Sequence, residues 1–109
     1  CVMMASAAEV MEKTLTEVEI VRPMVQVMAN VTAASVENPD HIKSLLVEQV
    51  TSIVRWRESV LAMRDAGVDT LIELGAGKVL SGLTKRIDPD LRPVNVETPE
   101  DIEAVLKII

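Results

Sequence analysis

The feature that most constrains the fold of this chain is an alternation of two hydrophobic periods along it. Apolar residues recur at helical spacing in some segments, and short runs rich in β-branched residues separate these segments. We expect helices over about 3–18, 38–50, 56–66, 79–87 and 98–109, and strands over 25–31, 70–74 and 94–96. Because strands that alternate with helices usually form parallel sheets, this order predicts an α/β fold of three layers, with helices covering a parallel sheet.

Polar and small residues mark the ends of several predicted helices. Asn38 is placed to cap the helix that starts with Pro39, and Gly67 is placed to end the helix that begins at Trp56. The segment Thr98-Pro99-Glu100-Asp101 is a typical opening for the last helix. In the helix over 79–87, the helical spacing predicts four buried side chains, namely Val79, Leu80, Leu83 and Ile87.

The composition excludes several classes of protein. Eleven basic against 17 acidic residues give a net charge of −6, which argues against a nucleic-acid-binding surface. One cysteine excludes an internal disulfide framework and a cysteine-based zinc site, and one histidine is too few for a multi-histidine metal site. No apolar run approaches the roughly 18 residues that would span a membrane. We therefore expect no nucleic-acid partner, no membrane partner, no metal and no other cofactor.

A glycine-rich segment, Gly75-Ala76-Gly77-Lys78, connects a predicted strand to a predicted helix. It does not match a Walker loop, because Ile72 stands where the first glycine would be and Val79 where Ser or Thr would be. A dinucleotide fingerprint would need a glycine at Leu80. Two interpretations remain: a tight turn that needs glycine for its backbone conformation, or a ligand site at the carboxyl end of a parallel strand.

Gln49 is a polar residue on the apolar stripe of the helix predicted over 38–50, so its amide should have hydrogen-bond partners. The alternative is an ordinary amide at a helix end, satisfied locally or by water.

No serine lies in a G-x-S-x-G motif, since Ser59 and Ser81 fall inside predicted helices. His41 lies among polar residues in a first helical turn. The chain alone therefore has no nucleophile paired with a base.

The section over 55–87 is the only mildly basic part of the chain, with six basic and four acidic residues. Solvated helix faces account for such a pattern without any function. The alternative is a docking surface for an acidic partner or a phosphorylated ligand.

Four segments together resemble one enzyme family. The runs QVTSIVRWRESV at 49–60 and IELGAGKVLSGLTKRI at 72–87 closely resemble the carboxyl-terminal third of malonyl-CoA:acyl-carrier-protein transacylases. VMANVTA at 27–33 fits the same family, and CVMMASAA at 1–8 resembles the segment that follows its catalytic histidine. The resemblance covers nearly the whole chain.

The resemblance implies an enzyme of cytoplasmic fatty acid biosynthesis. In this family a serine, deprotonated by a histidine, attacks malonyl-CoA, and the malonyl group passes to the phosphopantetheine thiol of acyl carrier protein. That serine, that histidine and the arginine that binds the malonyl carboxylate would all precede Cys1. Residues 1–109 would then be the carboxyl-terminal part of a large α/β hydrolase-like domain, a fragment rather than a complete domain. Its partners would be malonyl-CoA, acyl carrier protein and the amino-terminal remainder of the same enzyme.

The resemblance also assigns roles to two residues. Gln49 matches the family glutamine whose main-chain carbonyl orients the catalytic histidine, and Val79 matches a residue near the acyl pocket. Ile53 and Ala76 stand where many relatives have proline, so the two turns are expected to be less rigid here. Two alternatives stay open: the acyltransferase region of a polyketide synthase, and a non-catalytic α/β module that binds carrier protein.

Overall fold

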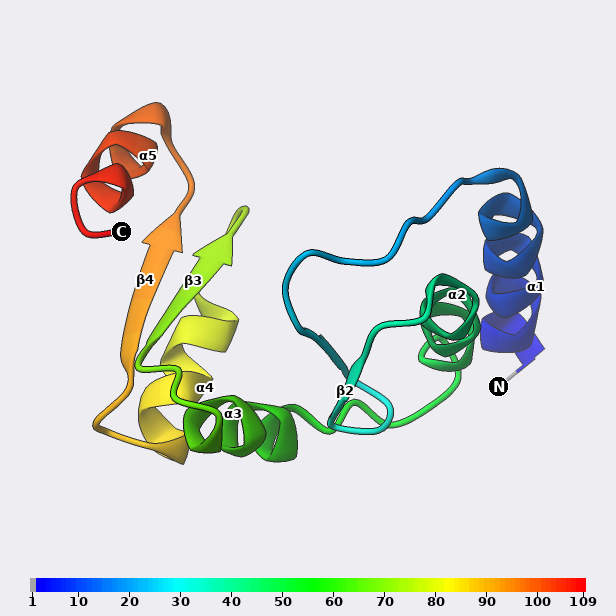
Figure 1. Cartoon of the computed structure of the whole chain (residues 1–109), viewed down its shortest axis with the longest axis horizontal. Coiled ribbons are helices and arrows are strands. Elements are labelled where there is room, and N and C mark those ends of the chain that lie inside the picture. The colour runs from blue at the N-terminus through cyan, green and yellow to red at the C-terminus, as the bar shows by residue number, and fades with distance from the viewer. Residues whose placement is uncertain (1) are drawn as a thin grey trace. The chain divides into compact units, whose positions relative to one another are not determined.

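A computed structural model describes residues 2–109, with side chains from residue 4 onward, and these residues form two compact units (Figure 1). Unit 1 extends to Ser59 and unit 2 begins at Val60. Along the chain the elements are α1 (Val2–Glu17), β1 (Val27–Ala29), β2 (Ala34–Val36), α2 (Pro39–Glu48), α3 (Trp56–Asp65), β3 (Thr70–Leu74), α4 (Val79–Ile87), β4 (Arg92–Val96) and α5 (Pro99–Leu106). All five predicted helices are present, and the α/β class is confirmed.

In unit 1, helix α1 packs against α2, and α2 contacts the first strand of a β-hairpin. The hairpin pairs β1 with β2 in antiparallel register, from Val27 opposite Val36 to Ala29 opposite Ala34. The predicted strand over 25–31 is therefore too long, and its expected place in the parallel sheet is wrong. The chain reverses at residues 30–33, where the Ala33 amide donates to the Ala29 carbonyl over 2.8 Å and Ala33 adopts a φ of 51°.

Helix α2 begins as its sequence predicts. The Asn38 side-chain oxygen accepts hydrogen bonds from the amides of Asp40 and His41, at 2.9 and 3.1 Å. These two amides belong to the first turn, where a helix offers no carbonyl partners, so the cap satisfies them. Further along the helix, Leu45 is buried. The cap and this apolar contact fix where α2 starts and which face it turns inward.

Unit 2 is built on a parallel pair of strands. β3 and β4 run side by side from Thr70 opposite Arg92 to Leu74 opposite Val96, with α4 as the crossover between them (Figure 1). Helix α4 packs against both strands, and α5 packs against β4. The predicted parallel pairing of these two segments is confirmed. Among the described residues this parallel sheet has two strands, rather than the three that the sequence predicts.

The inward face of α4 differs from the prediction. Val79 and Leu80 are 72% and 39% exposed, so their predicted burial is wrong. Ser81 and Thr84 are the buried residues of this helix. Their hydroxyl groups have partners, since Ser81 donates to Glu73 and Thr84 donates to the Leu80 carbonyl, each over 2.8 Å. Hydrogen bonding removes the cost of burying these hydroxyl groups, so the helix can turn a polar face toward the sheet.

The apolar core of unit 2 consists of Val60, Leu91, Val96 and Val105. Several large apolar side chains of the same unit stay exposed, among them Leu74, Leu106 and Ile109. No helix in the described part of the chain has the length and apolar character that crossing a bilayer requires.

Candidate functional site

Gln49 lies directly after the last residue of α2, with helical backbone angles of −63° and −21°. Its amide donates to the Leu45 carbonyl over 3.0 Å. Within residues 2–109, no backbone amide donates to the Gln49 carbonyl oxygen. The last carbonyls of a helix have no intrahelical donor, so this oxygen is available to accept a hydrogen bond from another group.

The side chain of Gln49 has the kind of partner that the sequence predicts for an amide on the apolar stripe of this helix. Its Oε1 atom accepts a hydrogen bond from Nδ2 of Asn30 over 3.4 Å, and both residues are half-buried. The two amides border a hollow of about 210 Å³ between the hairpin and α2. The remaining residues that line this hollow are apolar: Val27, Met28, Ala29, Val36, Ile42, Leu45 and Leu46.

Asn30 is a residue whose importance the sequence analysis missed. Its carbonyl accepts from the Arg55 amide over 3.0 Å, and the Arg55 guanidinium donates to the Thr32 carbonyl over 3.3 Å. The turn over 30–33 therefore holds both Gln49 and Arg55, at the two ends of the connection between α2 and α3. An asparagine within a supposed strand was the available signal, because asparagine is depleted in strands and common in turns.

The glycine-rich segment after β3 is a tight turn. Gly75 and Gly77 adopt φ values of 118° and 95°, which L side chains rarely adopt. The Gly75 amide donates to the Val96 carbonyl over 3.0 Å, which extends the pairing of the two strands. The backbone requirement for glycine therefore explains this motif without a bound ligand.

Glu73 lies two residues before this turn, and its carboxylate lies at the centre of a polar network. The sequence pattern did not predict this network. It accepts from the Leu80 and Ser81 amides at 3.3 and 3.0 Å, and from the Ser81 hydroxyl at 2.8 Å. Nδ2 of Asn95 donates to the same carboxylate over 3.1 Å and to the Ser81 hydroxyl oxygen over 2.8 Å. The hydrogen bond from the Ser81 hydroxyl is the main cause that lowers the pKa of Glu73.

This network argues against a phosphate ligand at the glycine turn, one kind of ligand that the sequence left open there. The amino-terminal end of a helix carries a partial positive charge that attracts anions. In α4 an internal carboxylate already takes up the amides of Leu80 and Ser81. A phosphate at that position would lose these two donors and meet a negative charge, so the α4 start is a poor phosphate site.

Val79 is the first residue of α4 and lies in unit 2, whereas Gln49 lies in unit 1. The side chain of Val79 is 72% exposed beside the turn, and Leu74 at the other end of the turn is 77% exposed. The carboxyl end of β3 thus presents apolar side chains to the surroundings. In α/β folds this edge of the sheet is where ligands usually bind.

The remaining chemical groups of the described residues do not form a catalytic pair. His41 is exposed in the first turn of α2, and Ser59 donates to the Arg55 carbonyl over 2.8 Å. Ser81 is bonded to a carboxylate rather than to a histidine. In the part of the chain that the structure describes, no three His, Cys, Asp or Glu residues are grouped to hold a metal ion.

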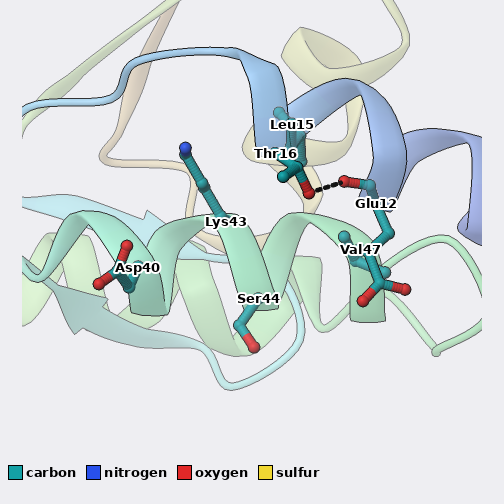
Figure 2. A pocket seen from close by; sticks show the side chains of 7 residues that line it. All are labelled: Glu12, Leu15, Thr16, Asp40, Lys43, Ser44 and Val47. Atoms are coloured by element: carbon teal, nitrogen blue, oxygen red, sulfur yellow. Dashed lines mark hydrogen bonds between the residues drawn. The ribbon is translucent and has the colours of Figure 1, made fainter.

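A further hollow of about 280 Å³ lies between α1 and α2 (Figure 2). Its lining mixes acidic, basic and apolar side chains from both helices: Glu12, Leu15, Thr16, Asp40, Lys43, Ser44 and Val47. The Thr16 hydroxyl donates to the Glu12 carbonyl over 2.8 Å, an ordinary bond within the helix. Neither Gln49 nor Val79 lines this hollow, and its mixed charges select no ligand class.

Comparison with known proteins gives consistent matches to one kind of enzyme, although no protein-family model matches the chain. The malonyl CoA-acyl carrier protein transacylase of Haemophilus influenzae is 41% identical over 105 residues, which are 96% of this chain and 34% of that protein.

Two solved structures are similar in both fold and sequence. The acyl-carrier-protein-S-malonyltransferase of Bartonella henselae matches with a TM-score of 0.87 and 44% identity, over 95% of this chain and 33% of that one. A malonyl-transacylase solved in complex with a type II PKS acyl-carrier protein matches with a TM-score of 0.86 and 33% identity, over 100% and 35%. The resemblance and the acyltransferase fold are confirmed, and this chain spans about a third of the length of these relatives.

Proposed function

We propose that this chain is the carboxyl-terminal part of a malonyl-CoA:acyl-carrier-protein transacylase. The whole protein would transfer malonyl from CoA to the phosphopantetheine thiol of acyl carrier protein, in cytoplasmic fatty acid biosynthesis. The observation that carries this proposal is a similarity that runs over 96% of the chain at 41% identity. The fold agrees, with a TM-score of 0.87 to a solved malonyltransferase.

The chemistry would be divided between this chain and the remainder of the polypeptide. The described residues hold no serine paired with a histidine. The attacking serine, the histidine that deprotonates it and the arginine that binds malonate would come from the remainder, about two thirds of the length of the relatives. This chain would support and orient those groups.

Gln49 would orient the histidine through its main-chain carbonyl. A histidine acts as a base at one ring nitrogen only if its other nitrogen keeps the proton, and a fixed acceptor holds that tautomer. The Gln49 carbonyl suits this role because no backbone amide of the described residues donates to it. The Gln49 amide bonds to Leu45, which places the carbonyl at the end of a regular helix.

Val79 would line the acyl pocket. Its exposed side chain lies at the carboxyl end of a parallel strand, beside a turn whose glycines keep the backbone open. An apolar wall there would contact the malonyl methylene without competing for its carboxylate.

Acyl carrier protein would dock through charge complementarity, because carrier proteins are acidic and the section over 55–87 is the basic part of this chain. Arg57 and Lys85 are exposed within it.

One observation favours a second candidate function, transfer to a polyketide synthase carrier: a similar malonyl-transacylase was solved with a type II PKS acyl-carrier protein. The two candidates differ in the carrier, not in the chemistry.

The test is a transfer assay with the full-length protein. Purified protein is mixed with malonyl-CoA and with carrier protein that carries phosphopantetheine, and the mass of the carrier is followed. We expect the carrier to gain one malonyl group, and carrier protein without phosphopantetheine to stay unchanged. A folded full-length protein that leaves every fatty-acid and polyketide carrier unmodified would refute the proposal and support a non-catalytic module.

A further inference from the structure

The residue at the N-cap position of α4 does not cap the helix with its own side chain. Lys78 is the cap residue, and its side chain makes no capping hydrogen bond. Apart from the glycine itself and its two neighbours in the chain, no heavy atom of the described residues lies within 4 Å of where a Cβ would stand on Gly75 or Gly77. The Gly75 amide bonds to the Val96 carbonyl at the start of the turn over 75–78, whereas Lys78 does not cap the helix at the other end of the turn. The position of the α4 start therefore depends on side chains outside the turn.

Glu73 supplies such a side chain. Its carboxylate accepts from two consecutive amides of α4, those of Leu80 and Ser81, and from the Ser81 hydroxyl. Because Glu73 is part of β3, these bonds join the strand before the turn directly to the helix after it. Hydrogen bonds to an ionised carboxylate are stronger than neutral ones, and a negative charge also suits the positive end of the helix.

Asn95 fixes the carboxylate from a third element. It is the direct neighbour of Glu73 in the parallel pair, and its amide donates to both Glu73 and Ser81. Strand β3, strand β4 and helix α4 are thereby joined at one carboxylate. This arrangement leaves the segment over 75–79 little freedom to shift.

We infer that Glu73 is a positioning residue, which fixes the turn over 75–78 and holds Val79 at the wall of the acyl pocket. The inference rests on the proposed function for the role of Val79, while the anchoring of the turn rests on the hydrogen bonds alone. Glu73 would not contact the substrate. Its effect would reach the acyl group through the placement of Val79.

The test compares Glu73→Gln with Glu103→Gln in the full-length protein. Both changes remove one negative charge and keep the side-chain size, but Glu103 is exposed on α5, away from the network. Two quantities are measured for each variant. The first is amide hydrogen exchange over residues 75–81, and the second is the ratio of kcat/KM for malonyl-CoA to kcat/KM for methylmalonyl-CoA.

We expect Glu73→Gln to speed exchange at Leu80 and Ser81 about tenfold. We expect it to change the substrate ratio about fivefold, since a displaced apolar wall alters discrimination against one extra methyl group. Glu103→Gln should change neither quantity. The substrate ratio is independent of how much enzyme is folded, so an equal loss for both substrates would mean a structural role only and would overturn the inference.

Two further outcomes are also decisive. If the wild-type protein transfers no malonyl, the proposed function fails, and the exchange experiment alone decides whether Glu73 anchors the turn; unchanged exchange would overturn that anchoring. If Glu73→Gln does not fold, Asn95→Ala takes its place. Asn95→Ala removes one donor to the carboxylate and leaves the bonds to α4, so it should produce smaller shifts in the same direction.

Discussion

Both units place a candidate site residue at the end of an element, but they hold it in different ways. In unit 1 the backbone bond to Leu45 places Gln49, and its side chain makes one neutral contact of 3.4 Å to Asn30. In unit 2 the turn before Val79 is held by the ionised side chain of Glu73, with donors as close as 2.8 Å. Side-chain identity should therefore matter little at Gln49 and a great deal at Glu73.

The largest expected effect is common to both units, since the described residues of neither unit include a nucleophile paired with a base. The isolated 109-residue chain should show no malonyl transfer from CoA to carrier protein. The full-length protein, assayed in parallel at equal concentration, is the positive control. Measurable transfer by the pure chain would refute the division of labour that we propose.

Substitutions of Gln49 in the full-length protein test whether its backbone, rather than its side chain, matters for activity. Gln49→Pro should lower kcat on the order of 10²-fold, or about 2.7 kcal/mol. Proline removes the amide that donates to Leu45 and disfavours the helical conformation of Glu48, so the carbonyl would move. Gln49→Ala keeps the backbone and should cost about tenfold or less.

The decisive quantity is the order of these two variants, measured only on preparations whose circular dichroism matches the wild type. If Gln49→Ala were as damaging as Gln49→Pro, the amide side chain would be the functional group. The backbone-carbonyl role would then be wrong.

Lowering the pH tests how far ionised carboxylate side chains, including that of Glu73, stabilise unit 2. The pKa of Glu73 is lowered chiefly by the Ser81 hydroxyl, that of Asp101 by the Glu97 amide and that of Asp88 by the Asp90 amide, all within unit 2. A folded pKa below the unfolded one stabilises the fold above the unfolded pKa, and this stability is lost as the pH falls through the folded value.

We therefore expect amide protection in β3 and α4 to weaken as the pH falls from about 5 to about 3. Hydrogen exchange, corrected for its intrinsic pH dependence, measures this change in the full-length protein. Glu73→Gln should show a smaller pH dependence than the wild type, because it lacks one of the titrating carboxylates. Constant protection across this range would contradict the role assigned to these carboxylates.

The smallest expected effect concerns docking. Reversing Arg57 and Lys85 together to glutamate should raise the apparent KM for carrier protein a few-fold at low salt, and less at high salt, since salt screens steering charges. Reversing Lys13 and Lys107 together to glutamate is the matched control, because both are exposed and lie outside the section over 55–87. A KM that does not change at low salt would mean that Arg57 and Lys85 are ordinary solvated residues with no role in docking.

The sequence by itself determined the local features of this protein. The capping residues Asn38 and Thr98 marked the starts of α2 and α5, and the structure shows both side chains bonded to the amides expected of caps. Gly67, with a φ of 101°, follows the end of α3 as predicted. These features depend on residues within a few positions of each other, so the sequence pattern is enough to find them.

Only the tertiary structure decided which distant residues meet. The polar inward face of α4 and the exposure of Val79 departed from the hydrophobic pattern. The antiparallel pairing of β1 with β2 departed from it as well, although these two strands are neighbours in the sequence. Two polar contacts that the hydrophobic pattern does not reveal join Asn30 to Gln49 and Glu73 to Asn95, which are 19 and 22 residues apart. A periodicity argument can indicate that a polar residue on an apolar stripe needs a hydrogen-bond partner, as it did for Gln49, but it cannot identify a partner that lies far along the chain.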